Sequence, residues 1–171
     1  MKTLYDAVAE HFSKGAHIAH DFKHVARTAS IAKYIAEKEG YDTNEAAVAA
    51  LLHDMGRTVQ EEEKGHGPAG VPLAKQLLDE YTEYDDETKQ RILRAIAEHS
   101  EAKTEGLLTH IVQDADMVDG LGAIGIMRAC TSKAHLPDYY PENFIPAVGQ
   151  RRGTTVCGQI AFQMEWVDFL V

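Results

Sequence analysis

The segment AAVAALLHDMG, residues 46–56, is an apolar run that ends on a histidine and an aspartate shortly before a glycine. An unbroken apolar run of this kind favours a buried helix, which would stop near Gly56. An aspartate in the last turn faces the negative end of the helix dipole, which is unfavourable unless a cation lies beside it. His53 and Asp54 therefore predict a bound metal ion.

Apolar residues elsewhere also recur with helical period, and no segment alternates apolar and polar residues as a half-buried strand does. The sequence predicts an all-α fold, a helical bundle in a single domain over residues 1–171. A loop is expected over residues 57–67, and helical character over residues 121–129. The helices are expected at about residues 3–14, 21–39, 43–54, 68–81, 85–99 and 105–119, and from about residue 155.

The C-terminal part of the chain is expected to be less regular. Its span 131–153 contains three prolines and is typical of lids and binding loops. The last helix ends at Val171 with no polar cap or breaker, which indicates either a truncated chain or an apolar face that forms a homodimer.

Composition excludes several classes of partner. The chain has 27 acidic and 17 basic residues, and its net charge of -10 disfavours extended nucleic acid and anionic membrane surfaces. The chain starts without an apolar signal segment and has no run of the roughly 18 apolar residues needed to cross a bilayer, so we expect a cytoplasmic protein. Cys130 and Cys157 are accordingly expected to be free thiols.

Two further histidines lie on apolar helix faces. His24 shares a face with Ile31 and Ile35, and His99 shares one with Ile96. Both imidazoles are expected to point into the core, where a single histidine is more often hydrogen-bonded than metal-bound. The remaining histidines have no such apolar context and are expected at the surface or in loops: His11, His17, His20, His110 and His135.

Three carboxylates, Asp114, Asp116 and Asp119, crowd one otherwise apolar helix. Carboxylates so close together repel one another unless some are solvated or meet a cation. Asp116 and Asp119 lie on one face, and we expect Asp116 to bind the metal with Asp119 beside it. Imidazole and carboxylate ligands without thiolates suit a divalent ion such as Mn, Fe, Co, Ni, Zn or Mg.

A histidine, a His-Asp pair and a distal aspartate on separate helices form a more specific signal than any of them alone. The chain resembles the HD superfamily of metal-dependent phosphohydrolases, and in particular its small bacterial and archaeal members, over about residues 19–129. By this resemblance the metal ligands would be His24, His53, Asp54 and Asp116. The resemblance is carried by HVAR (24–27), LLHDMG (51–56), AIAEHS (95–100), IVQDAD (111–116) and LGAIGI (121–126).

The resemblance leaves the number of metal ions open. In binuclear members of the superfamily two further histidines hold a second ion, with the aspartate of the pair as a bridge, and His66 and His99 match those places. One metal ion is the expectation and two are the alternative. Without a second ion, His66 or His99 could contact substrate, form local hydrogen bonds, or exchange protons with the water or the leaving group.

The resemblance implies hydrolysis of a phosphoester or phosphoanhydride, with nucleotides as the leading substrate class. Asp54 would orient the attacking water, and Arg27, Arg57 and Arg128 are the expected phosphate-binding residues. Some relatives carry an acid at the place of Arg57, so a mechanism that needs this acid does not transfer. Two alternatives are a di-iron oxygenase and a non-catalytic nucleotide-sensing domain.

Overall fold

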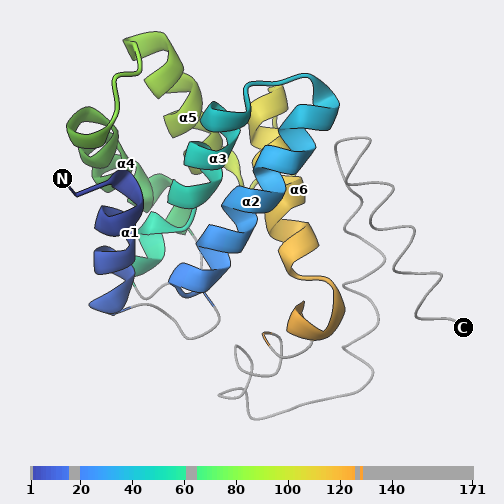
Figure 1. The fold of residues 1–171 in the computed structure, drawn as a ribbon, viewed down its shortest axis with the longest axis horizontal. Helices are drawn as coiled ribbons and strands as arrows, with labels where there is room; N and C mark the ends of the chain where they lie inside the picture. Colours follow the sequence, from blue (N-terminus) through green and yellow to red (C-terminus); the bar gives the residue numbers. More distant parts are fainter. Residues whose placement is uncertain (1, 16–19, 61–64, 126–127, 129–171) are drawn as a thin grey trace, which may run out of the picture.

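The computed structural model describes residues 2–15, 20–60, 65–125 and 128. No residue in this part of the chain forms a strand, which confirms the predicted all-α fold. Figure 1 shows the helices in their colours along the chain. In chain order they are α1 (Leu4–Ser13), α2 (Phe22–Glu39), α3 (Thr43–Leu52), the 3-10 helix η1 (Met55–Thr58), α4 (His66–Tyr81), α5 (Asp86–Glu98) and α6 (Leu107–Asp119).

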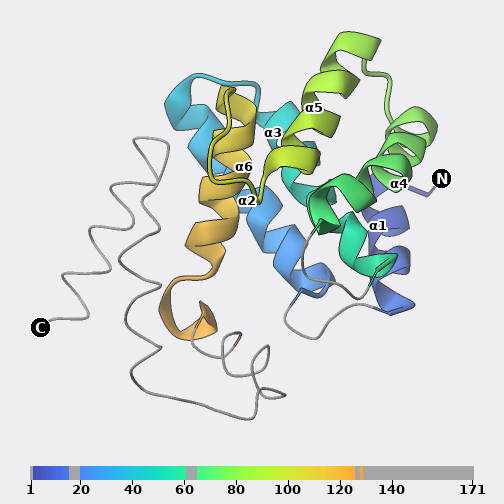
Figure 2. The ribbon, with the colours of Figure 1, turned by 180° about the vertical axis from the view of Figure 1, so that it is seen from behind.

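Helix α3 lies at the centre of the bundle. Helices α2 and α6 pack on one side of it and α5 on the other, with α4 against α5 and η1 (Figure 1). The view from behind shows the same arrangement, with α1 at the edge beside α4 (Figure 2). The end of α3 therefore points into a space enclosed by the other helices.

The sequence of α3 explains its central position. Its buried residues include Ala46, Ala49, Ala50, Leu51 and Leu52, so more than one face is apolar. A helix that is apolar all round is stable only when neighbours cover it on every side. Its alanines are small and let the neighbouring helices approach closely.

The helix ends agree with the predicted signals to within a few residues. Asp21 caps α2 by accepting a hydrogen bond from the backbone N–H of His24, and Gly40 ends this helix in the left-handed conformation, with φ 71°. Helix α3 stops at Leu52 with His53 as its cap, slightly before the expected end at residue 54. The predicted loop over 57–67 was wrong at both ends, where η1 and the first turn of α4 lie.

Two glycines bring the start of α4 against η1. A Cβ atom on Gly56 would overlap the carbonyl oxygen of His66, and one on Gly70 would lie 2.7 Å from the backbone nitrogen of Gly56. Only residues without a side chain allow this approach. The two glycines thereby place His66 beside Asp54.

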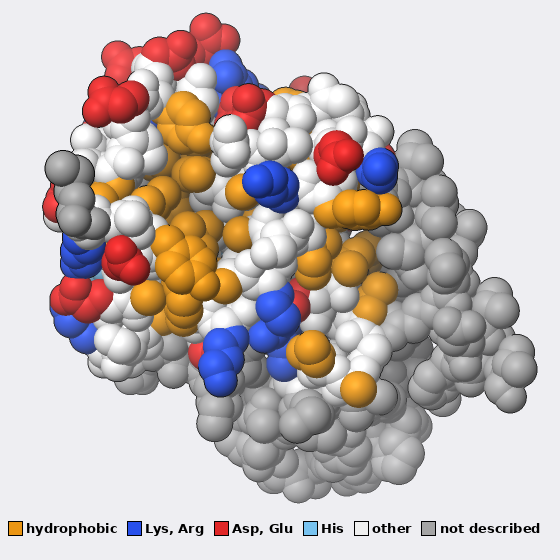
Figure 3. Space-filling view, in the orientation of Figure 1, with side chains coloured by type: hydrophobic (Ala, Val, Ile, Leu, Met, Phe, Trp, Pro, Cys, Tyr) orange, Lys and Arg blue, Asp and Glu red, His pale blue; other side chains and the backbone are white. Residues whose placement is uncertain are grey.

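The surface of the described residues is acidic at one edge. Acidic side chains gather where α4 leads into α5, at the upper left of Figure 3. The exposed members of this group are Asp79, Glu80, Glu83, Asp85, Asp86 and Glu87. A phosphorylated ligand would be repelled from this edge.

Several predictions lie outside the described residues. They concern the span 131–153, the helix from about residue 155, both cysteines, His17 and His135. Within the ranges described, none of the helices is both long enough and apolar enough to span a membrane.

Candidate metal centre

Four predicted ligands come together at the inner end of α3. His24 reaches the centre from α2, His53 and Asp54 from the end of α3, and Asp116 from α6. The Nε2 atom of His24 lies 3.3 Å from Asp116 Oδ1 and 3.6 Å from Asp54 Oδ2. The Nε2 atom of His53 lies 3.6 Å from Asp54 Oδ2 and 4.0 Å from Asp116 Oδ1. Four donor atoms at these separations could surround one cation.

The rings of His53 and His99 are held in one tautomer. The Nδ1 atom of His53 donates to the carbonyl oxygen of Ala50, and that of His99 donates to Ile96, both at 2.7 Å. A carbonyl oxygen only accepts, so the proton is on Nδ1 and the Nε2 lone pair of each neutral ring is available. This is the tautomer that a metal ligand requires.

His24 and His53 each carry a buried nitrogen without a hydrogen-bond partner. In the described part of the chain, the Nε2 atoms of these two rings are fully buried and unpaired. A buried polar atom normally has a partner, because leaving it unpaired costs about 1–3 kcal/mol. Both atoms face Asp54 and Asp116, so a cation among these groups would satisfy all of them. The residues present therefore fit a divalent metal ion.

Asp54 presents a different set of neighbours at each carboxylate oxygen. At Oδ2, His20 Nδ1 lies at 2.8 Å, next to His24 and His53. At Oδ1, Arg57 Nε donates at 2.9 Å, and the Nε2 atoms of His66 and His99 lie at 3.4 and 3.9 Å. Asp54 is 1% exposed and is the residue about which the whole cluster is arranged.

His66 and His99 also lie near Asp54, but their Nε2 atoms face each other. His66 and His99 approach Nε2 to Nε2 at 2.9 Å. Because Nδ1 of His99 carries a proton, its Nε2 accepts from His66 when the ring is neutral. The Nε2 lone pair of His99 is then occupied by this hydrogen bond, so a second metal ion would have to displace the bond.

Charge and burial shift the pKa values of the cluster in opposite directions. Burial lowers the pKa of His53 and of His99, which favours neutral rings. Burial also opposes protonation of His24, but Asp116, Asp119 and Asp54 outweigh it and raise the pKa of His24 to about 10. Burial would raise the pKa of Asp54, yet the basic side chains around it, His53, His20, His24 and Arg57, hold that pKa well below its usual range. Without a metal, the proton on His24 compensates the carboxylates.

The three predicted phosphate-binding arginines all lie at the cluster, each paired with a carboxylate. Arg57 donates to Asp54, whereas Arg27 and Arg128 both donate to Asp119. Asp119 is buried, and it also accepts from Nδ1 of His24 at 2.8 Å. The structure thus places Asp119 beside the cluster, behind His24.

His20 lies in the loop before α2, one of its two expected places, but it is not at the surface. Its side chain is 20% exposed and its Nδ1 atom donates to Asp54. His20 stands just before the Asp21 cap, four positions ahead of His24, and this spacing puts the two rings on one side of the chain. That spacing was the available signal, and the ring centroids are indeed 5.4 Å apart.

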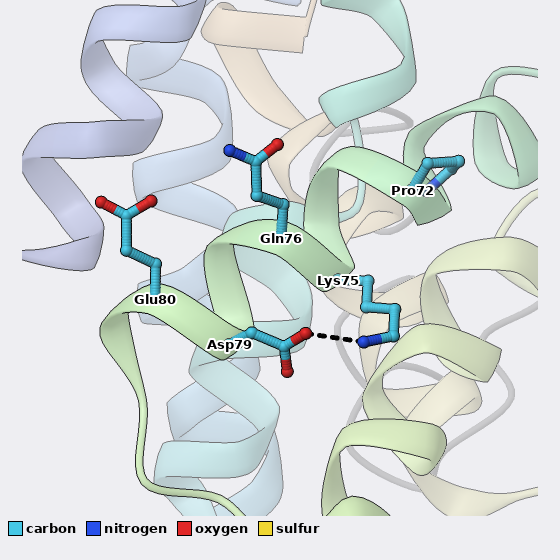
Figure 4. Close-up of a pocket in the computed structure, with 5 residues that line it drawn as sticks. All are labelled: Pro72, Lys75, Gln76, Asp79 and Glu80. Carbon is cyan, nitrogen blue, oxygen red and sulfur yellow. Dashed lines mark hydrogen bonds and ion pairs between the residues drawn. The ribbon is translucent and has the colours of Figure 1, made fainter.

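A separate surface depression carries no comparable chemistry. It is open and shallow, and it lies along α4, with the side chains projecting from that helix and Lys75 bonded to Asp79 (Figure 4). Its lining residues are Pro72, Lys75, Gln76, Asp79 and Glu80. None of them is a histidine, and the depression gives no reason to move the site from the histidine cluster.

Comparisons with known proteins point to one family. The family model of the HD domain matches residues 21–121. YpgQ of Bacillus subtilis is 33% identical over 121 residues, which cover 64% of this chain and 55% of YpgQ. Ribonuclease Y of Lawsonia intracellularis is 35% identical over 101 residues, which cover 57% of this chain and 18% of that enzyme. The chain therefore spans about half of one relative and less than a fifth of the other.

Solved structures show the same fold. A predicted HD superfamily hydrolase from an uncultured Thermotogales bacterium has a TM-score of 0.74 and 27% identity, covering 98% of this chain and 85% of that one. YpgQ of Bacillus subtilis in complex with ADP has a TM-score of 0.66 and 21% identity, covering 98% and 90%. The second likeness is a likeness of fold alone.

Proposed function

Because the chain belongs to the HD domain family, we propose that it is a metal-dependent phosphohydrolase that cleaves a phosphoester or phosphoanhydride of a small molecule. One observation carries this proposal. The buried, unpaired Nε2 atoms of His24 and His53 converge with two carboxylates, which is a ligand set for a divalent metal ion.

His24, His53, Asp54 and Asp116 would hold the metal. When bound, such an ion lowers the pKa of a water molecule and polarises a phosphoryl oxygen. Asp54 orients the attacking water by accepting a hydrogen bond from it, and Arg57, at the same carboxylate, stabilises negative charge on the phosphate. His66 or His99 exchanges a proton with the water or with the leaving group.

One metal ion is the simpler proposal, and a second is the alternative. The two-sided surroundings of Asp54 favour a bridge, because Oδ1 faces His66 and His99 while Oδ2 faces His24 and His53. The hydrogen bond between His66 and His99 favours a single ion, because it occupies one of the two Nε2 lone pairs that would bind a second ion.

The proposed substrate class is nucleotides. The ADP complex of YpgQ supports this class, because the sequence of YpgQ is 33% identical over 121 residues and its fold is shared. The name ribonuclease Y describes a much longer enzyme, of which this chain matches 18%. The net charge of -10 favours a small ligand over extended RNA. A cytoplasmic location and a homodimer remain predictions.

A substrate screen on protein loaded with one metal at a time tests the proposal. Mononucleotides, nucleoside triphosphates and sugar phosphates are supplied with Mn, Mg, Co, Ni or Zn, and released phosphate and pyrophosphate are measured. We expect turnover that needs the metal and is lost in Asp54→Asn. Tight binding of one nucleotide without any turnover would instead identify a nucleotide-sensing domain.

A di-iron oxygenase is the second candidate. The position of Asp54 between two pairs of histidines is the observation that favours it, because its two oxygens could then serve two metal ions. The six residues that would hold two irons are His24, His53, Asp54, His66, His99 and Asp116. Two irons per chain in protein purified without chelators, together with oxygen-dependent turnover, would replace the hydrolase proposal.

A further inference from the structure

Asp119 is the most heavily bonded carboxylate near the cluster. Its Oδ1 atom accepts from Arg27 Nε at 2.6 Å. Its Oδ2 atom accepts from Arg27 Nη2 at 2.9 Å, from Arg128 Nη1 at 2.8 Å and from His24 Nδ1 at 2.8 Å. The side chain is only 3% exposed. Asp119 therefore ties the end of α6 to α2 at the point where α2 carries a proposed metal ligand.

The hydrogen bond from His24 determines how its ring is presented. With Nδ1 bonded to Asp119, the opposite nitrogen, Nε2, faces Asp54 and Asp116. The backbone of His24 is fixed separately, because its N–H donates to the Asp21 cap at 2.9 Å. Ring and backbone are thus oriented by two different carboxylates. A carboxylate behind a metal-bound imidazole commonly fixes its orientation and increases its basicity.

Arg27 and Arg128 compensate the negative charge of Asp119. Asp119 is the last residue of α6, where the helix dipole disfavours negative charge. Arg27 donates hydrogen bonds from two nitrogens to both carboxylate oxygens, and Arg128 adds a second cation. The guanidinium groups thereby hold the carboxylate in the position from which it accepts a hydrogen bond from Nδ1 of His24.

We propose that Asp119 is a positioning residue of the metal centre: held by Arg27 and Arg128 (the clamp), it orients the proposed metal ligand His24. The two arginines then support this metal ligand and do not anchor the substrate. The proposal rests on the proposed metal site. It separates Arg27 and Arg128 from Arg57, which contacts Asp54 directly. It predicts that loss of the clamp weakens metal binding even when no substrate is present.

The chain offers a matched control for Arg27. Arg91 holds the buried carboxylate of Glu45, at the start of α3, through Nε at 3.0 Å and Nη2 at 3.2 Å, so it binds with two nitrogens as Arg27 does. The arginine side chains are similarly exposed, 43% for Arg91 and 35% for Arg27. Arg27→Ala and Arg91→Ala therefore each remove a two-nitrogen ion pair to a buried carboxylate, Arg91→Ala also removes the bonds to Glu87 and Thr88, and only Arg27→Ala touches the proposed metal centre.

The experiment is a calorimetric titration of metal-free protein with Mn²⁺ alone, beside thermal unfolding of the same samples. We expect Arg27→Ala and Asp119→Asn to weaken Mn²⁺ binding about 10- to 100-fold. Arg91→Ala should lower the unfolding temperature but leave the Mn²⁺ affinity within about twofold of the wild type. If Asp119→Asn does not fold, the comparison of Arg27→Ala with Arg91→Ala gives the answer.

Two results would overturn the proposal, and they differ in what else they overturn. In the first, the wild type binds Mn²⁺ and Arg27→Ala binds it equally well, but the KM of Arg27→Ala for substrate rises. Arg27 is then a substrate anchor, and only its positioning role is refuted. If the wild type binds no Mn²⁺ or other divalent ion, the metal site falls as well.

Discussion

The carboxylate of Asp54 lies among five histidines and an arginine, and this crowding of basic side chains around one acid defines the centre. Its oxygens approach His24 and His53 on one side and His66 and His99 on the other. In the metal-free protein the charge is balanced in part by a proton on His24, whose pKa is raised to about 10. A metal ion and this proton compete for one nitrogen atom.

This competition predicts that metal binding depends on pH. Since the pKa of His24 is about 10, at lower pH a metal must displace one proton from its ring. The apparent affinity should rise about tenfold per pH unit between roughly pH 6.5 and 9, with close to one proton released per metal. Calorimetry in two buffers of different ionisation enthalpy counts the protons. Affinity that stays constant over this range would contradict the assignment of His24.

The residues of the centre differ in how far sequence could reveal them. Helical spacing on apolar faces and the His-Asp pair singled out His24, His53 and Asp116, because local periodicity dictates which way such side chains point, and the structure brings the three together. The partners of Arg27 and Arg128 could not be predicted. Both arginines bind Asp119 across a tertiary contact, and no local pattern encodes the partner of a long, flexible side chain.

At the level of the helices, the contact between η1 and α4 depends on Gly56. We expect Gly56→Ala to destabilise the fold by about 1–3 kcal/mol, because the new methyl group would overlap the backbone of His66. Urea unfolding measures this loss. Displacement of His66 should also lower turnover in the remaining folded protein.

Gly40→Ala provides the comparison for this variant. Its Cβ meets open space, and the cost is confined to the left-handed backbone at the end of α2. It should lose stability without losing turnover. Equal turnover losses in the two variants would show that the contact with His66 has no particular role.

The helix ends show what sequence can and cannot resolve. Asp21 and Gly40 are cap residues whose local conformations fix the ends of α2, and the helix expected at about residues 21–39 agrees with both ends. At the end of α3 the expected stop signal, Gly56, lies beyond the helix, because the chain passes through His53 into a 3-10 turn that is stabilised by packing against α4. Tertiary packing, which no local pattern records, sets that boundary.

For the molecule as a whole, the negative net charge favours small anionic substrates over long ones. A net charge of -10 and the acidic edge at the junction of α4 and α5 oppose a polyanion, whereas a nucleotide needs only the few basic groups at the centre. We expect single-stranded RNA to be neither retained in filter binding nor cleaved at physiological salt, under conditions in which mononucleotides or ADP are tested as substrates. Efficient RNA cleavage would place the chain functionally with ribonuclease Y.

The most direct test is a titration of metal-free protein with Mn²⁺ for the wild type, His53→Ala, Asp116→Ala and His110→Ala. His110 is a suitable control because it lies on α6 with Asp116 but bonds to the backbone of Thr104 instead of joining the cluster. We expect one tight site in the wild type and in His110→Ala, and none in the other two variants. Full metal binding by both His53→Ala and Asp116→Ala would contradict the metal centre and, with it, the proposed hydrolysis.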